Sequence, residues 1–160
     1  MSEIIRRAAP ADAADIAEMI HALAEFEHAA DQCTVTENQI HTALFGNTPI
    51  AHAHVAEVDG VVAAMALWFV NFSTWDGAGG IYLEDLFVRN AFRRRGLARR
   101  LLATLAGECV DSGYTRLSWA VPNWNVDAIA LYDGVGAQPQ YEWTTYRLSG
   151  SALAELAGPR

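Results

Sequence analysis

Hydrophobic residues recur along the chain at two different spacings, and these spacings divide it into elements. After Pro10 and Asp12 the apolar positions follow a helical period as far as Ala24. Residues 97–109 repeat that pattern, and Gly113 supplies a helix stop. Both segments are therefore predicted to be amphipathic helices. Shorter helices are predicted over 36–44, which opens with a Thr-x-x-Gln capping box, and over 125–135.

Apolar runs of strand length lie between these helices. The strands predicted over 51–58 and 61–70 are joined by Asp59-Gly60, a dipeptide that strongly indicates a tight hairpin. The glycine-rich residues 72–80 are interpreted as a loop. Other strands are predicted over residues 4–8, 81–88, 117–121 and 142–148. Because strands and helices interleave without a linker, we expect one α/β domain over residues 1–160 with a mixed sheet.

Composition narrows the class of protein. The chain has 160 residues, of which 52% are hydrophobic and 19% charged, and these values are typical of a folded domain. Its net charge of −8 argues against nucleic-acid binding and suits a cationic small substrate. The N-terminus does not resemble a signal peptide, and no apolar run is long enough to span a membrane. We therefore expect a cytoplasmic protein. Cys33 and Cys109 have no metal-ligand spacing, and no metal is expected.

The turn that precedes the helix over 97–109 has the features of an anion site. It reads Arg93-Arg94-Arg95-Gly96-Leu97-Ala98 and directly follows an apolar run. The free N–H groups of a first helical turn attract negative charge, and guanidinium groups bind phosphate oxygens in pairs. Gly96 allows a tight turn, and Ala98 leaves room beside the backbone. A cofactor with a pyrophosphate is one interpretation; the alternative is a basic turn that caps an ordinary surface helix.

A second segment favours the cofactor. Residues 125–136 match Asn-x-x-Ala-x-x-x-Tyr-x-x-x-Gly through Asn125, Ala128, Tyr132 and Gly136. The two segments, in this order, resemble the acetyl-CoA-binding core of the GCN5-related N-acetyltransferase (GNAT) superfamily. Further segments resemble its diamine (spermidine/spermine) acetyltransferase branch: residues 23–27, 71–75, 82–88 and 124–125.

The resemblance implies the GNAT fold, in which two neighbouring parallel strands of a mixed sheet splay apart to admit acetyl-CoA. The cofactor core would span about residues 81–137. It implies that the backbone of Leu86, Phe87 and Val88 binds the pantetheine arm. The pyrophosphate would be held by the turn and the helix start, here Arg93, Arg94, Arg95, Gly96, Leu97, Ala98 and Arg99. Asn125 would bind pantetheine or simply cap its helix.

The chemistry requires a proton donor for the departing thiolate and acidic groups for the amine. Tyr132 is the candidate general acid, because a phenol stays protonated at neutral pH; the alternative is a core aromatic residue. Glu84 is the second catalytic candidate. Together with Asp85 it would border the acceptor site, and strand alternation predicts that the two side chains point to opposite faces. Glu27 and Trp75 would complete substrate binding, although a solvated helix end and a loop anchor are as plausible.

The sequence thus predicts an N-acetyltransferase that uses acetyl-CoA and acts on a primary amine of a diamine, a polyamine or a lysine-like compound. Two alternatives remain open: acetylation of a protein or peptide amino group, and a domain that binds acetyl-CoA without turnover. Trp143, Tyr146 and Leu148 alternate along the predicted final strand, and branch members are typically dimeric. A homodimer is therefore expected.

Overall fold

The computed structural model describes residues 2–160. The chain divides into two compact units, the first ending at Val126 and the second comprising Asp127–Arg160. In the part of the chain that the structure describes, none of the helices has the length and apolarity needed to cross a membrane.

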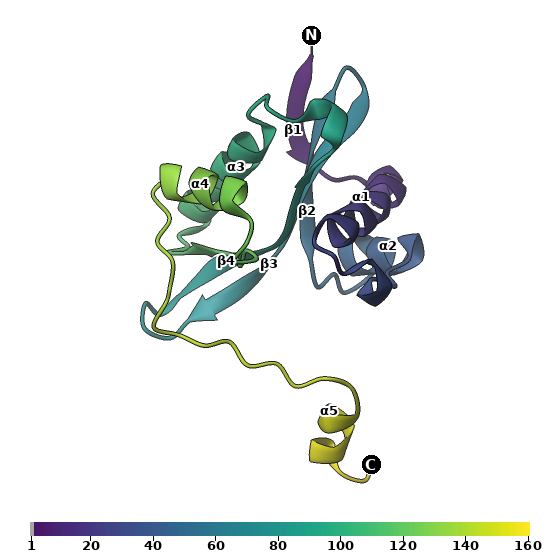
Figure 1. Ribbon diagram of the computed structural model, residues 1–160, viewed down its shortest axis with the longest axis vertical. Helices are drawn as coiled ribbons and strands as arrows, with labels where there is room; N and C mark the ends of the chain where they lie inside the picture. The colour runs from purple at the N-terminus through teal and green to yellow at the C-terminus, as the bar shows by residue number, and fades with distance from the viewer. Residues whose placement is uncertain (1) are drawn as a thin grey trace. The chain divides into compact units, whose positions relative to one another are not determined.

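The first unit is built around a five-stranded sheet with the strands in sequence order (Figure 1). The neighbouring strands are antiparallel except the last pair, which is parallel. The mixed α/β sheet expected from the sequence is thereby confirmed. The strands are β1 (Glu3–Arg7), β2 (His52–Val58), β3 (Val61–Ser73), β4 (Ala78–Val88) and β5 (Leu117–Ser118).

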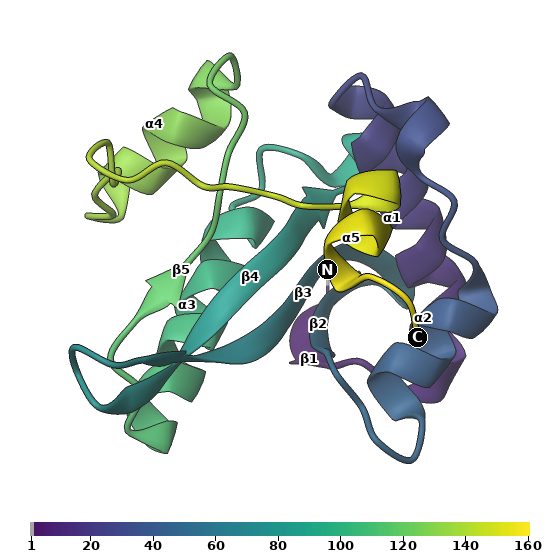
Figure 2. The ribbon, with the colours of Figure 1, turned by 90° about the horizontal axis from the view of Figure 1, so that it is seen from below.

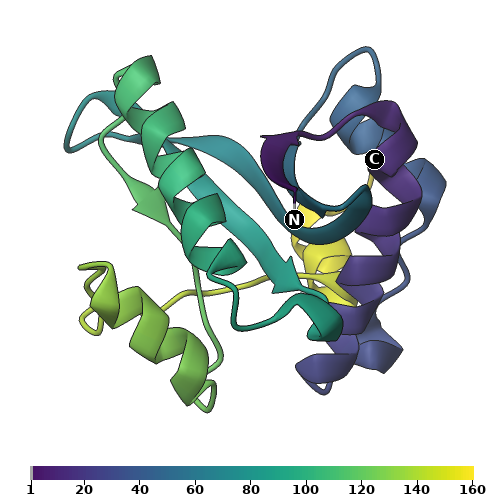
Figure 3. The same ribbon diagram turned by 90° about the horizontal axis from the view of Figure 1, so that it is seen from above.

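Helices cover both faces of this sheet. Figure 1 shows α1 and α2 on one side and α3 on the other, and Figure 3 shows α1 and α2 lying against each other. The largest core cluster joins α1 and α2 to one face of the sheet, through side chains such as Ile16, Met19, Met65 and Leu67. The helices are α1 (Ala13–Phe26), α2 (Glu37–Phe45) and α3 (Leu97–Ser112), with 3₁₀ turns at Pro10–Asp12, Ala30–Gln32 and Asn90–Phe92.

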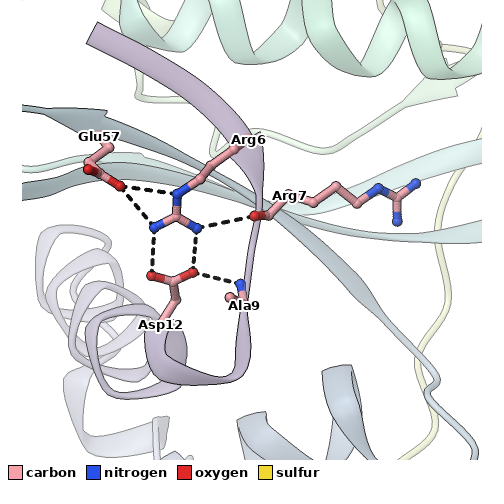
Figure 4. A network of polar contacts seen from close by, with 5 residues as sticks. All are labelled: Arg6, Arg7, Ala9, Asp12 and Glu57. Atoms are coloured by element: carbon pink, nitrogen blue, oxygen red, sulfur yellow. Dashed lines mark hydrogen bonds and ion pairs between the residues drawn. The ribbon is translucent and has the colours of Figure 1, made fainter. Parts of the chain in front are cut away.

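A buried carboxylate fixes the start of α1 (Figure 4). Asp12 is 5% exposed and accepts two hydrogen bonds from the Arg6 guanidinium, at 2.7 and 3.1 Å. It also accepts a hydrogen bond from the Ala9 N–H at 2.7 Å, and Arg6 in turn pairs with Glu57 of β2. The Arg6 hydrogen bonds hold the pKa of Asp12 below its usual range. This charge network therefore links β1, β2 and the 3₁₀ turn that leads into α1.

A second polar cluster lies under α3. The Nδ1 atom of buried His54 accepts a hydrogen bond from the indole Nε1–H of Trp68 at 3.1 Å. This bond leaves the proton of a neutral ring on Nε2, which lies 3.4 Å from a carboxylate oxygen of Glu108. Arg7 pairs with the same carboxylate at 3.1 Å and lies over the Trp68 ring. Burial is the main cause that lowers the pKa of His54.

The predicted hairpin at Asp59-Gly60 is confirmed, with both residues at positive φ. The predicted loop over 72–80 is wrong in its bounds, because only residues 74–77 form a turn. Residues 69–73 and 78–82 are paired strands of a long β3–β4 hairpin. The glycines there serve close packing: a Cβ atom on Gly79 would lie 2.7 Å from the Tyr114 ring. A run of glycine looks like a flexible loop in sequence but here permits one strand to approach an aromatic ring.

The second unit contains α5 (Gly150–Ala157) and all but the first residue of α4 (Val126–Gly134). The helix predicted near 125–135 is confirmed, and α5 was not predicted. The strand predicted over 142–148 is wrong, because no other segment among the described residues pairs with it. Trp143 and Tyr146, both expected in that strand, are exposed instead, at 75% and 93%. Alternation favours an extended chain, but only a hydrogen-bonded neighbour makes it a strand.

Candidate functional site

The parallel strands β4 and β5 are joined over a short distance only. Their pairs are Ile81 with Leu117 and Tyr82 with Ser118, which together make up the whole of β5 (Figure 2). Beyond Tyr82, β4 continues to Val88 in a ladder with β3 alone. The side of β4 that faces away from β3 is therefore unpaired within the described residues. This includes the predicted pantetheine-binding residues, of which Phe87 is buried and both Leu86 and Val88 are half-buried.

The arginine-rich turn connects the end of β4 to α3. Arg94 and Gly96 both adopt a left-handed conformation, with φ of 64° and 76°, and Gly96 is the residue directly before the helix. No side chain caps this helix start. The first N–H groups of α3 are consequently available to an anion, and they carry the positive end of the helix dipole. Leu97 is buried and anchors the helix start, while Ala98 is half-buried.

The arginines of this turn differ in their contacts. The Arg93 guanidinium lies over the rings of Phe26 and Phe87, and Arg95 lies over Phe92, 4.0 Å from a carboxylate oxygen of Glu3. Arg94 and Arg99 are exposed, and within residues 2–160 neither forms an ion pair with a carboxylate. Arg94 and Arg99 are therefore the arginine side chains here with the most freedom to bind a phosphate.

Three acidic side chains gather where α1 ends beside β4. Desolvation is the first cause that raises the pKa of Asp85 to about 6, and the charges of Glu84 and Glu27 raise it further. Glu27 is the C-cap residue of α1, and burial raises the pKa of its carboxyl group as well. A cation bound here would reduce the repulsion between these carboxylates and would offset the cost of desolvating them. The structure thus brings together three of the four predicted acceptor residues.

The prediction that Glu84 and Asp85 point to opposite faces assumed a regular strand. The ladder instead shifts here, since Leu67 pairs with Asp85 while Trp68 pairs with Leu83. Glu84 is the additional residue of a β-bulge, and strict alternation does not hold at a bulge. Glu84 is exposed, whereas Asp85 is half-buried. No local pattern in the sequence signals this irregularity.

The fourth predicted acceptor residue lies elsewhere. Trp75 is 84% exposed and occupies the turn of the β3–β4 hairpin. From Leu67, opposite Asp85, to Ser73 the strand rises about 3.3 Å per residue, so the turn lies about 20 Å from the acidic group. The adjacent Asp76 is bound by Thr115 and Arg116 near β5, at 2.8 and 3.0 Å.

Aromatic side chains that were not predicted as site residues border the acidic group. Trp124 packs against Phe26 and His28, with ring centroids 5.6 Å apart in both pairs. The segments around Phe26 and Trp124 carried part of the family resemblance, but their contact joins distant parts of the sequence. Phe26 at the end of α1 thus contacts both the Arg93 guanidinium and the Trp124 ring.

Two further residues that were predicted to bind the cofactor, Asn125 and Tyr132, lie at the start of α4 and within it. Asn125 directly precedes this helix, and its N–H bonds the Pro122 carbonyl at 3.0 Å. Tyr132 is half-buried on the helix, in the second unit. Its role as general acid stays a prediction. Within residues 2–160, no three His, Cys, Asp or Glu side chains gather as potential metal ligands.

Comparison with known proteins shows the family to which this chain belongs. Residues 17–137 match the family described as "Acetyltransferase (GNAT) family". The chain is 35% identical to thialysine N-epsilon-acetyltransferase of Bos taurus, with 97% of each chain covered. It is 30% identical to L-ornithine N5-acetyltransferase of Arabidopsis thaliana, with 95% and 86% covered. A solved integron cassette protein from the mobile metagenome of V. cholerae has the same fold, with a TM-score of 0.83, 24% identity and 99% of each chain covered.

Proposed function

The chain belongs to the acetyltransferase (GNAT) family and is an N-acetyltransferase, and we propose that it transfers acetyl from acetyl-CoA to the side-chain amine of a small, lysine-like acceptor. The mammalian and plant relatives are named for thialysine and ornithine, which are amino acids with a primary amine at the end of the side chain. Diamines and polyamines share that terminal ammonium group and form the second acceptor class to test.

The acidic group at Asp85 is the observation that carries this proposal. Its carboxyl has a pKa of about 6 because it is desolvated near two other acids, Glu84 and Glu27. Near neutral pH this concentrates negative charge at a partly buried position, which attracts an alkylammonium group. Trp124 lies within reach of the same helix end and offers an aromatic face to the acceptor's methylene chain.

The proposed cofactor position follows from the turn and from the unpaired side of β4. The pyrophosphate would bind the N–H groups at the start of α3, with Arg94 and Arg99 supplying charge. The pantetheine arm would follow the backbone of Leu86 and Phe87. The Val88 carbonyl is less available to the pantetheine arm, because it already accepts a hydrogen bond from Arg93 Nε at 3.1 Å.

The proposed reaction needs three proton transfers. Asp85, or Glu84 through water, accepts a proton from the bound ammonium, and the resulting neutral amine attacks the thioester carbonyl. The tetrahedral intermediate collapses, the carbon–sulfur bond breaks, and Tyr132 gives its phenolic proton to the departing thiolate. The surplus proton of the former amine nitrogen then passes, through water, to the Tyr132 phenolate and restores the phenol. The products are the acetylated amine and free CoA. Most of the rate enhancement comes from holding amine and thioester in contact.

A screen that measures CoA thiol release tests the proposal. Thialysine, lysine, ornithine, spermidine and a lysine-containing peptide are compared at equal concentration with acetyl-CoA. The proposal predicts faster release with the free amino acids or the polyamine than with the peptide. A preference for the peptide would favour the protein-acetylating alternative, and cofactor binding without thiol release from any amine would favour a binding domain.

We also propose that the chain folds as one domain and forms a homodimer through its C-terminal segment. Trp143 and Tyr146 expose large apolar rings, which is unusual unless a partner covers them. Sedimentation at micromolar concentration tests this, since the monomer mass is 17.4 kDa. A fully active monomer would contradict the proposal.

A further inference from the structure

Arg93 connects two elements that border the acidic group. Its Cζ atom lies 5.3 Å from the ring centroid of Phe26 and 5.6 Å from that of Phe87. Its Nε donates a hydrogen bond to the Val88 carbonyl at 3.1 Å. Phe26 is the last residue of α1, while Phe87 and Val88 end β4. Although Arg93 is exposed overall, one guanidinium group thus contacts the end of a helix and the end of a strand.

The end of α1 needs such a contact for electrostatic reasons. Its last turn contains no basic residue, and Glu27 places a carboxylate where the helix dipole is negative. A cation supplied from another element compensates this arrangement. The first half of α1 is held in a similar way, because Arg89 at the end of β4 pairs with Asp15 and Glu18.

We infer that Arg93 is a positioning residue: it fixes the end of α1 against β4 and so sets Glu27 beside Asp85, in the site where the acceptor amine binds. This inference rests on the proposed function for the identity of that site. It also revises the role expected from the sequence, which assigned the Arg93 side chain to the pyrophosphate. The contacts direct that side chain toward the acceptor side of the turn and leave Arg94 and Arg99 for the cofactor.

Steady-state kinetics of Arg93→Met tests the inference. Methionine keeps an apolar stem but removes the charge, so the acceptor KM should rise about tenfold, which corresponds to the loss of roughly 1.4 kcal/mol. The kcat and the Kd for CoA, measured by calorimetry, should change less than about twofold. Arg93→Lys, which retains a cation, should restore part of the acceptor affinity. A higher Kd for CoA with an unchanged acceptor KM would overturn the inference.

Arg7→Met is the matched control. Arg7 also lies over an aromatic ring, that of Trp68 at 5.2 Å, and it pairs with Glu108 under α3. It has no contact with α1 among those described, so its variant should leave the acceptor KM unchanged. A similar KM change in both variants would mean that any lost cation–aromatic contact has this effect.

Hydrogen exchange provides a measurement that does not depend on turnover. The amides of Glu27, His28 and Ala29 bond to carbonyls of the last turns of α1, at 2.8 to 3.1 Å. They should exchange faster in Arg93→Met than in the wild type or in Arg7→Met. Faster exchange in a protein that acetylates none of the amines would support positioning of the helix end and refute the proposed function. Normal exchange and a normal KM in an active enzyme would refute the inference alone.

Discussion

Asp85 lies directly opposite Leu67 in the β3–β4 ladder, whereas the next pair along is Trp68 with Leu83. Leu67 belongs to the core cluster that packs against α1. Residues that pair across two strands share a face of the sheet, so Asp85 lies on the α1 side. The Asp85 carboxyl is therefore desolvated on the face that carries the core cluster, and this is the first cause of its raised pKa.

Replacing Asp85 with Asn should stabilise the free protein above pH 6. The pKa of the Asp85 carboxyl is about 6 in the folded protein, against an ordinary value of 3.8. Its contribution to folding stability is therefore greatest below pH 4 and is lost as the pH rises through 6. At pH 8 the ionised group costs up to about 3 kcal/mol. Asp85→Asn should therefore raise Tm at pH 8 by several degrees and leave Tm at pH 4 nearly unchanged.

Glu84→Gln is the control for that measurement, because Glu84 is exposed on the same bulge. It should shift Tm little at either pH. The wild type should lose acceptor binding as the pH falls through 6, whereas Asp85→Asn should bind the acceptor weakly at every pH. A wild-type stability that rises steadily from pH 4 to 8 with the slope unchanged in Asp85→Asn would contradict the assignment.

Replacing Tyr132 with Phe tests the proton donor. If the phenol protonates the thiolate, kcat should fall by about 10²–10⁴-fold, while Tm and the Kd for CoA stay close to the wild-type values. Stopped-flow measurement of thiol release separates this chemical step from product release. An unchanged rate would leave Tyr132 a packing residue, with water as the donor.

Replacing Gly96 with Val tests the cofactor turn, and Gly113→Val is a matched control at the other end of α3. Both glycines have positive φ, 76° and 71°, and a Cβ atom on either would meet no atom within 4 Å. Backbone strain should therefore lower the stability of both variants similarly, by about 1–2 kcal/mol. Only Gly96→Val should also weaken CoA binding, measured by calorimetry. Equal CoA affinity in the two variants would mean that Gly96 serves only the turn.

The buried His54 should make the protein sensitive to acid. Because its pKa is lowered in the folded state, its contribution to stability is complete above pH 6.5 and is lost as the pH falls below it. Protonation would also place a second donor on Nδ1, facing the indole N–H of Trp68. Since Asp85 has the opposite pH dependence, urea unfolding is best compared in the Asp85→Asn background.

In the Asp85→Asn background, His54→Gln should be less stable than its parent at pH 7.5, by about 1–2 kcal/mol, because Trp68 and Glu108 lose a well-placed partner. Between pH 6.5 and 5 its free energy of unfolding should decrease less than that of the parent. Parallel pH profiles would show that His54 does not titrate in this range.

The sequence predicted the elements whose signals are local. The capping box at Thr36 and the turn at Asp59-Gly60 are present as expected, as is the helix that ends at Gly113. The same holds for the turn before α3, since Gly96 and the arginines adjoin the helix start. Family resemblance added Glu27 and Asp85, which no local pattern singles out.

What could not be predicted depends on contacts between distant residues. The bulge at Glu84 is a property of the β3–β4 ladder, and the contact of Arg93 with Phe26 depends on where α1 ends. The missing strand over 142–148 is a similar case, because its residues have the right pattern but no neighbouring strand among the described residues. The spacing of apolar residues is a property of one segment, whereas a β-strand also needs a second segment with which to form hydrogen bonds.

The close approach of the β3–β4 hairpin to its neighbours limits how this enzyme can be redesigned. A Cβ atom on Gly80 would lie 2.7 Å from the Asn71 side-chain oxygen and 3.0 Å from the Arg116 carbonyl, and Gly79 is as tightly enclosed by Tyr114. Combinatorial libraries over this hairpin should therefore keep both glycines and diversify Trp75 and Gly77 instead, where a new side chain meets solvent. Gly77 accepts Asn or Asp most readily, because its φ is 65°.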